Sequence, residues 1–272
     1  MSAFFGRSQV GQFVGPVIGG VITDLLGFRA LFLAYAAMGV LVMLISFVLK
    51  EFEGARRAHR GGFFSFAKLS DLDPMFRTTF LILVFGTFCM MMRGTVFNSM
   101  VPLYAGRELG YSATQIGALF GLVGLINVLM IAPSGYLSDK IGRKAATVPA
   151  AALVGLSFVV FGVATTLPML TIAAGLHGLG SGFALGSMST STFDISPEGS
   201  IARFQSLRRF AAEMGSISGP PFAGVVASVF SVQAVFLVFA PLFLVSALLL
   251  AFVAKETHPD KRRASRVVEA PA

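Results

Sequence analysis

The sequence predicts an all-α integral membrane protein, a bundle of about eight transmembrane helices. Of its 272 residues, 55% are hydrophobic and only 12% are charged, and the mean hydropathy is +0.81. In a soluble domain about a quarter of the residues are charged. The apolar residues form blocks of roughly 20, the length that crosses about 30 Å of hydrocarbon. The basic residues that give a net charge of +8 lie between these blocks, so they indicate topology rather than nucleic-acid binding.

Apolar runs bounded by polar, Gly and Pro residues define the expected helices. The spans are expected at 8–26, 29–49, 76–100, 114–135, 145–166, 169–191, 206–229 and 232–254. The connections at 27–28, 167–168 and 230–231 are so short that the helices they join must be antiparallel. The longer segment 50–75 is polar, basic and contains glycine, which is typical of a solvated linker.

Basic residues are distributed very unequally between the two sides of the expected membrane. One set of loops and both termini hold 18 of the 21 Lys and Arg residues. The opposite side holds only Arg29 and Arg107, and Arg93 lies within a span. Because cytoplasmic loops carry an excess of Lys and Arg, both termini are expected in the cytosol. The expected location is the plasma or inner membrane, crossed several times.

An internal repeat relates the first two expected helices to the last two. The segment 11–21 recurs 204 residues later as 215–225, with Gly15-Pro16 matching Gly219-Pro220. Four helices lie between the copies, which indicates a repeat unit of six. Four helices of the first unit are therefore expected to be missing from this chain. The expected division is 1–49 for the last two helices of an N-terminal half, 50–75 for a cytoplasmic linker, 76–254 for a complete C-terminal six-helix half and 255–272 for a cytoplasmic tail.

The turn between the fourth and fifth expected helices has a distinctive pattern of charges. Residues 135–144 read Gly-Tyr-Leu-Ser-Asp-Lys-Ile-Gly-Arg-Lys. The glycines permit a tight turn, and the acid can pair with bases or accept backbone N–H bonds. A basic loop that only fixes topology is one interpretation. The pattern closely resembles the signature loop of the major facilitator superfamily, which implies a cytoplasmic gate contact made by Gly135, Asp139, Lys140, Gly142, Arg143 and Lys144.

The first expected helix carries a second motif. Gly11, Gly15 and Gly19 recur every four residues and leave one helix face without side chains. Pro16 frees a carbonyl and bends the helix. A generic packing face would explain the glycines alone. Together with Gly20, the pattern resembles the fifth-helix motif of the family's drug:proton antiporters.

Several polar residues lie at membrane depth and are candidates for contact with a substrate. A charge in lipid is costly, so we expect the side chain of Arg93 either to face a cavity or a partner or to extend to the outer surface. Asn98 and Asn127 are further candidates, and Met91 offers adaptable apolar surface, although lipid contact or packing would also explain it. His177 is interpreted as a structural hydrogen-bonding residue rather than a proton carrier.

No set of catalytic or metal-ligating residues is recognisable, so we do not expect an enzyme. The resemblance implies a secondary active transporter, with proton-coupled efflux of small amphipathic or drug-like molecules by alternating access as the favoured activity. An uptake permease for a small metabolite or sugar is one alternative, and a transport-incompetent truncated fragment is another. No cofactor is expected besides the coupling proton. The expected partners are a small-molecule substrate and the lipid bilayer, without nucleic acid, and the complete protein is expected to be a monomer.

Overall fold

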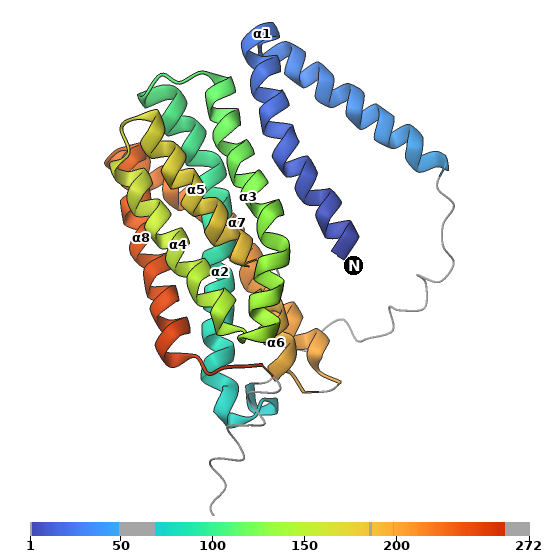
Figure 1. Ribbon diagram of the computed structural model, residues 1–272, viewed down its shortest axis with the longest axis vertical. Helices are drawn as coiled ribbons and strands as arrows, with labels where there is room; N and C mark the ends of the chain where they lie inside the picture. The colour runs from blue at the N-terminus through green and yellow to red at the C-terminus, as the bar shows by residue number, and fades with distance from the viewer. Residues whose placement is uncertain (1, 49–68, 185–186, 198, 259–272) are drawn as a thin grey trace, which may run out of the picture.

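The computed structural model describes residues 2–48, 69–184, 187–197 and 199–258. Within these ranges every regular element is a helix, so the all-α prediction is confirmed. Figure 1 shows a bundle of helices, with the first helical segment of the chain alongside the bundle and the second extending away from it. Most of the expected linker 50–75 and of the expected tail 255–272 lies outside the described residues.

The N-terminal helix α1 (Ser2–Val48) consists of two helices joined at Gly27. This residue has φ 79° and ψ 170°, a backbone conformation that glycine adopts without steric cost. The break confirms the two predicted spans 8–26 and 29–49. The segment before Gly27 packs against α3, whereas the segment after it diverges from the bundle and exposes large side chains such as Phe32 and Phe47 (Figure 1).

The remaining helices agree with the predicted spans to within a few residues, and α5 and α6 together cover the span at 169–191 except for residues 185–186, which lie outside the described residues. Their bounds are η2 (Leu69–Asp71), α2 (Pro74–Leu103) with the π-helical turn η3 (Tyr104–Glu108), α3 (Ala113–Lys140), α4 (Lys144–Val163), α5 (Leu167–Ala184), α6 (Ser187–Ile195), α7 (Ile201–Val229), and α8 (Val232–Leu248) with the π-helical turn η4 (Leu249–Val253).

Six helical stretches in the described part of the chain are long and apolar enough to cross a membrane. One of them is Val14–Phe47, which contains both segments of α1. Helix α7, at 29 residues, is long enough but does not reach that apolarity, because residues 215–224 are rich in Ser, Gly and Pro. With α1 counted as two helices and α7 included, the bundle has the roughly eight long helices that the sequence predicts.

Helix starts follow from local sequence. The side chain of Asp73 accepts the N–H of Met75 at 3.1 Å, and Pro74 is the first residue of α2. At the start of α3, Ser112 and Gln115 form a reciprocal capping box. These caps determine where α2 and α3 begin.

Close packing of α4 against α8 forms one wall of the bundle. A Cβ atom at Gly155 would lie 2.6 Å from Cδ2 of Leu244, and one at Gly162 would overlap Leu237. Phe158 and Phe161 of α4 contact Phe236 of α8, with ring centroids 5.7 and 5.3 Å apart. Helix α4 also packs on α5, and through α5 this wall supports the cavity.

Candidate functional site

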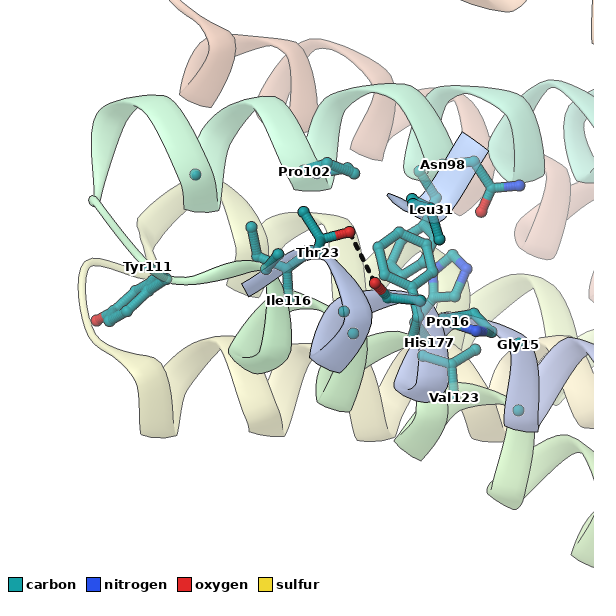
Figure 2. Close-up of a pocket in the computed structure, with 18 of the residues that line it drawn as sticks. Gly15, Pro16, Thr23, Leu31, Asn98, Pro102, Tyr111, Ile116, Val123 and His177 are labelled. Atoms are coloured by element: carbon teal, nitrogen blue, oxygen red, sulfur yellow. Dashed lines mark hydrogen bonds between the residues drawn. The ribbon is translucent and has the colours of Figure 1, made fainter. Parts of the chain in front are cut away.

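A cavity of about 1350 Å³ lies between α1 and the bundle formed by α2, α3 and α5. Figure 2 shows Pro16 of α1, Asn98 of α2, Val123 of α3 and His177 of α5 arranged around it. Ligand pockets for drug-sized molecules have volumes of about 300–1000 Å³. The cavity is therefore large enough for such a ligand.

Glycines allow α1 to approach α3 closely along one wall. A Cβ atom at Gly20 would lie 2.5 Å from the carbonyl oxygen of Ala113, and one at Gly117 would lie 2.5 Å from that of Pro16. The Asp24 carboxylate accepts the N–H groups of Ala113 and Thr114 at 3.1 and 2.7 Å. Asp24 thus binds the positively polarised N-terminus of α3.

The motif glycines of α1 do not share one role. Gly15, Pro16, Gly19 and Gly20 all line the cavity, and Gly11 lies further toward the N-terminus of the same helix. A Cβ atom at Gly15 would have no other atom within 4 Å, whereas Gly20 is in backbone contact with α3. Close packing therefore requires glycine at Gly20 but not at Gly15.

Arg93 of α2 lines the cavity and contacts His177 of α5. Its Nη1 lies 2.6 Å from Nε2 of His177, and its Nε donates to the carbonyl oxygen of Met90 at 3.3 Å. A guanidinium has donors only, so Nε2 of His177 must be the acceptor. The imidazole is therefore neutral in this contact, with its proton on Nδ1.

Aromatic and hydroxyl groups hold the His177 ring in place. The ring stacks on Phe97 at a centroid distance of 3.9 Å and an interplanar angle of 15°. The other ring nitrogen of His177, Nδ1, lies 3.4 Å from Oγ of Ser157. The Ser181 hydroxyl lies 2.8 Å from both the carbonyl oxygen of His177 and Oδ1 of Asn127, and the second contact connects α5 to α3. The predicted hydrogen-bonding role of His177 remains a prediction, but its partners are now identified.

The other predicted contact residues lie in different environments. Asn98 is exposed and lines the cavity, and Asn127 lines it from α3. Met91 is 43% exposed and is not among the cavity-lining residues, so the structure does not bring it together with Arg93 and the two asparagines. Among the described residues no group of three or more His, Cys, Asp or Glu side chains could hold a metal ion.

A second polar cluster lies where α3 ends and α4 begins, at the opposite end of α3 from Asp24. Arg143 pairs with Asp139 at 2.6 Å and with Asp194 of α6 at 2.8 Å. Burial disfavours the charged guanidinium, but the hydrogen bonds to Asp194 and Asp139 outweigh this effect and raise the pKa of Arg143. Asp139 is largely exposed, so Asp194 is the better buried of the two partners of Arg143.

The carboxylate of Glu256, which follows η4, binds the start of α4. It accepts the backbone N–H groups of Arg143 and Lys144 at 2.9 and 3.2 Å. Gly142 has φ 126°, and a Cβ there would lie 2.7 Å from Oε2 of Glu256. Lys144 donates to the carbonyl oxygen of Ala251 at 2.8 Å. The predicted motif residues Arg143, Lys144 and Gly142 thus meet the end of the last helix, whereas Lys140 and Gly135 are exposed.

Comparison with known families accounts for this architecture. The family model described as Major Facilitator Superfamily matches residues 83–272, which is more than half of the chain. The chain belongs to the major facilitator superfamily. This is a family of membrane transporters, so the chain is a multi-pass membrane protein and not a member of an enzyme family.

Individual relatives of this superfamily are distant. An uncharacterized MFS-type transporter, YuxJ of Bacillus subtilis (strain 168), is 24% identical over 96% of this chain and 68% of its own length. The multi-drug resistance efflux pump PmrA of Streptococcus pneumoniae is 23% identical over 83% of this chain and 57% of its own length. The putative multidrug resistance protein MdtD of Klebsiella pneumoniae is 24% identical over 66% of this chain and 38% of its own length. The chain thus spans between about two fifths and two thirds of these relatives.

Solved structures share the major facilitator fold at low sequence identity. A peptide transporter POT in complex with sulfate has a TM-score of 0.60 and 14% identity, covering 74% of this chain and 46% of that one. A POT family transporter in complex with 5-aminolevulinic acid has a TM-score of 0.57 and 18% identity, covering 70% and 43%. At these identities the likeness concerns the fold alone.

Sequence reasoning identified neither Asp24 and Ser157 beside the cavity nor Asp194 and Glu256 in the second cluster. Asp24 is an acid within a predicted apolar helix, the same signal that identified Arg93, and could have been found by it. Ser157 gave no signal, since a lone serine in an apolar helix is common. Glu256 lies in the repeated Lys-Glu pair at the end of the last span, but nothing in the sequence indicates that it reaches Gly142.

Proposed function

We propose that the protein is a secondary active transporter that exports small amphipathic or drug-like molecules by alternating access. The cavity between α1 and the bundle is the observation that carries this proposal. It combines aromatic and aliphatic walls with a few polar groups, which is typical of small-molecule sites. It also lies where the two six-helix halves predicted from the sequence would meet, the place at which transporters of this architecture bind substrates.

Two features favour efflux over uptake. Relatives of the chain are named as a multi-drug resistance efflux pump and as a putative multidrug resistance protein. Four of the α1 residues that resemble an antiporter motif, Gly15, Pro16, Gly19 and Gly20, line the same cavity.

The proposed coupling ion is the proton, and no other cofactor is needed. The proposed location is the plasma or inner membrane with both termini in the cytosol, because the basic residues favour that orientation. Labelling of an exposed Lys140→Cys variant from the cytosolic side alone would support this orientation, and labelling from outside intact cells would contradict it. The complete protein is proposed to act as a monomer.

The test is transport in liposomes that contain the protein expressed from its complete gene. A pH gradient is imposed across the membrane, and the movement of anionic, neutral and cationic fluorescent probes is followed. We expect at least one probe to move in a direction that reverses when the gradient is reversed. No gradient-dependent movement of any probe would contradict the proposal. The 272-residue chain alone, tested in parallel, would show whether it is transport-incompetent.

A further inference from the structure

We infer that the cavity selects amphipathic anions and that Arg93 binds their anionic group. This inference rests on the proposed transport function and specifies the class of its substrate. It depends on the charges that line the cavity, on the unused donors of Arg93 and on the aromatic groups beside it.

The described residues lining the cavity include two charged side chains, Arg93 and Asp24. Both carboxylate oxygens of Asp24 already accept backbone N–H groups at the start of α3. Neither residue takes part in an ion pair within the described part of the chain. The charge of Asp24 is therefore compensated by the start of α3, whereas no charged group compensates Arg93 within the described part of the chain.

The contact with His177 does not neutralise Arg93. Because Nε2 of His177 accepts a hydrogen bond, the imidazole is neutral and contributes only a dipole. Of the guanidinium nitrogens, Nε binds the Met90 carbonyl and Nη1 binds His177, whereas Nη2 has no hydrogen-bond partner among the described residues. A cation at membrane depth is costly unless a partner compensates it. A bound carboxylate, sulfonate or phosphate would supply both the opposite charge and the missing acceptor.

The surroundings of Arg93 suit a ligand with an apolar body. Phe97 and Phe120 line the cavity next to it, with ring centroids 5.1 Å apart, and Tyr35 and Phe28 line it from α1. Asn98, exposed five residues along α2 from Arg93, offers an amide for the ligand's remaining polar atoms. An anionic head with an aromatic or aliphatic body therefore fits this cavity better than a cation does.

The test uses three probes that share a naphthalene ring and differ in charge: naphthylacetate, naphthylacetamide and naphthylethylammonium. The protein is placed in lipid nanodiscs, and binding is followed by the fluorescence anisotropy of the ring, with empty nanodiscs as the blank. The chain contains no Trp, so protein tryptophan does not obscure the probe. We expect naphthylacetate to bind about tenfold or more tightly than the other two, since a hydrogen bond to a charged group contributes about that factor.

Variants at Arg93 show whether this side chain causes the preference. Arg93→Gln should weaken naphthylacetate binding about tenfold or more and leave naphthylacetamide binding unchanged, which also shows that the cavity is intact. Arg93→Lys keeps the charge but not the planar fork, so its affinity for the anion should be intermediate. Arg209→Gln is the matched control, because Arg209 is exposed and pairs with Glu213 outside the cavity. It should change none of the three affinities.

Two results would overturn the inference. One is a wild-type protein that binds the cation or the amide as tightly as the anion. The other is an anion preference that persists in Arg93→Gln. If Arg93→Gln does not fold, the inference is tested by the order of the three probe affinities in the wild type and by the affinity of Arg93→Lys for naphthylacetate. Failure of the transport function would be seen differently, as an absence of gradient-driven flux for all probes while binding is retained.

Discussion

Glu256 and Gly142, which lie 114 positions apart in the sequence, meet at the start of α4, where a Cβ on the glycine would lie 2.7 Å from the glutamate Oε2. The same carboxylate accepts two backbone N–H groups of the helix start. The end of the last helix is therefore attached to the turn between α3 and α4 by the polar groups of one side chain.

Removal of this carboxylate should destabilise the protein. Glu256→Ala leaves two N–H groups at the helix start without an acceptor, so we expect a loss of about 0.5–2 kcal/mol in unfolding free energy, as for a lost helix cap. Glu256→Gln keeps an acceptor oxygen and should lose less. The melting temperatures of the purified proteins in detergent give the order of stability of the variants. Glu213→Ala removes one partner of an exposed ion pair and is the control, so it should have almost no effect. Equal melting temperatures for the wild type and all three variants would contradict the capping role of Glu256.

Gly142 should tolerate no side chain. Alanine there combines φ 126° with a clash against Glu256, so we expect Gly142→Ala to cost roughly 1–3 kcal/mol. Gly135→Ala, within α3 and with nothing inside 4 Å of its Cβ position, should be neutral or slightly stabilising. Thermal melting of both variants is the measurement. A melting temperature for Gly142→Ala as high as that of Gly135→Ala would show that the turn is not as described.

The two ends of the α1 motif should respond differently to alanine. Gly20→Ala places a methyl group against the Ala113 carbonyl and should force α1 away from α3, with an overpacking cost of roughly 1–3 kcal/mol. Gly15→Ala places its methyl group in the cavity and should fold normally. Disulfide cross-linking between cysteines introduced at Thr23 and Thr114 would report the approach of the helices. Unchanged cross-linking in Gly20→Ala would contradict the close contact.

His177 should stabilise the protein mainly as an acceptor for Arg93. His177→Phe retains an aromatic ring but removes Nε2, which leaves the guanidinium with one acceptor fewer at membrane depth; we expect a loss of roughly 1–3 kcal/mol. Ser157→Ala should have a smaller effect, because its contact with Nδ1 is long at 3.4 Å. Melting temperatures of the two variants test this order. A larger loss of stability in Ser157→Ala than in His177→Phe would show that the main interaction of the ring is at Nδ1 and not at Nε2.

The positions of the helices could be predicted from the sequence, whereas their rotations could not. A span has the length that the bilayer imposes, so apolar blocks were sufficient to place the helices and the reversal at Gly27. Lipid and the bundle interior are both apolar, so the residues on the two sides look alike. Met91 and Met92 are adjacent in sequence, yet one is 43% exposed and the other is buried.

Contacts between distant segments also lay beyond sequence reasoning. Arg93 could be identified as a candidate because its charge is unusual at membrane depth. Its partner His177 lies 84 residues away on another helix, and only the folding of the bundle brings the two side chains together. The same holds for Asp194, which pairs with Arg143 across a separation of 51 residues.

The central claim is that the cavity is an aqueous substrate pathway that opens to each side of the membrane in turn. Labelling of an Asn98→Cys variant with a membrane-impermeant thiol reagent tests it most directly, because Asn98 is exposed in the cavity and the native Cys89 is buried. The protein from the complete gene is labelled from each side in turn, with and without a pH gradient. We expect labelling from both sides, slowed by a transported probe, with a ratio that changes with the gradient. Labelling from one side at a rate that neither gradient nor probe alters would contradict the account.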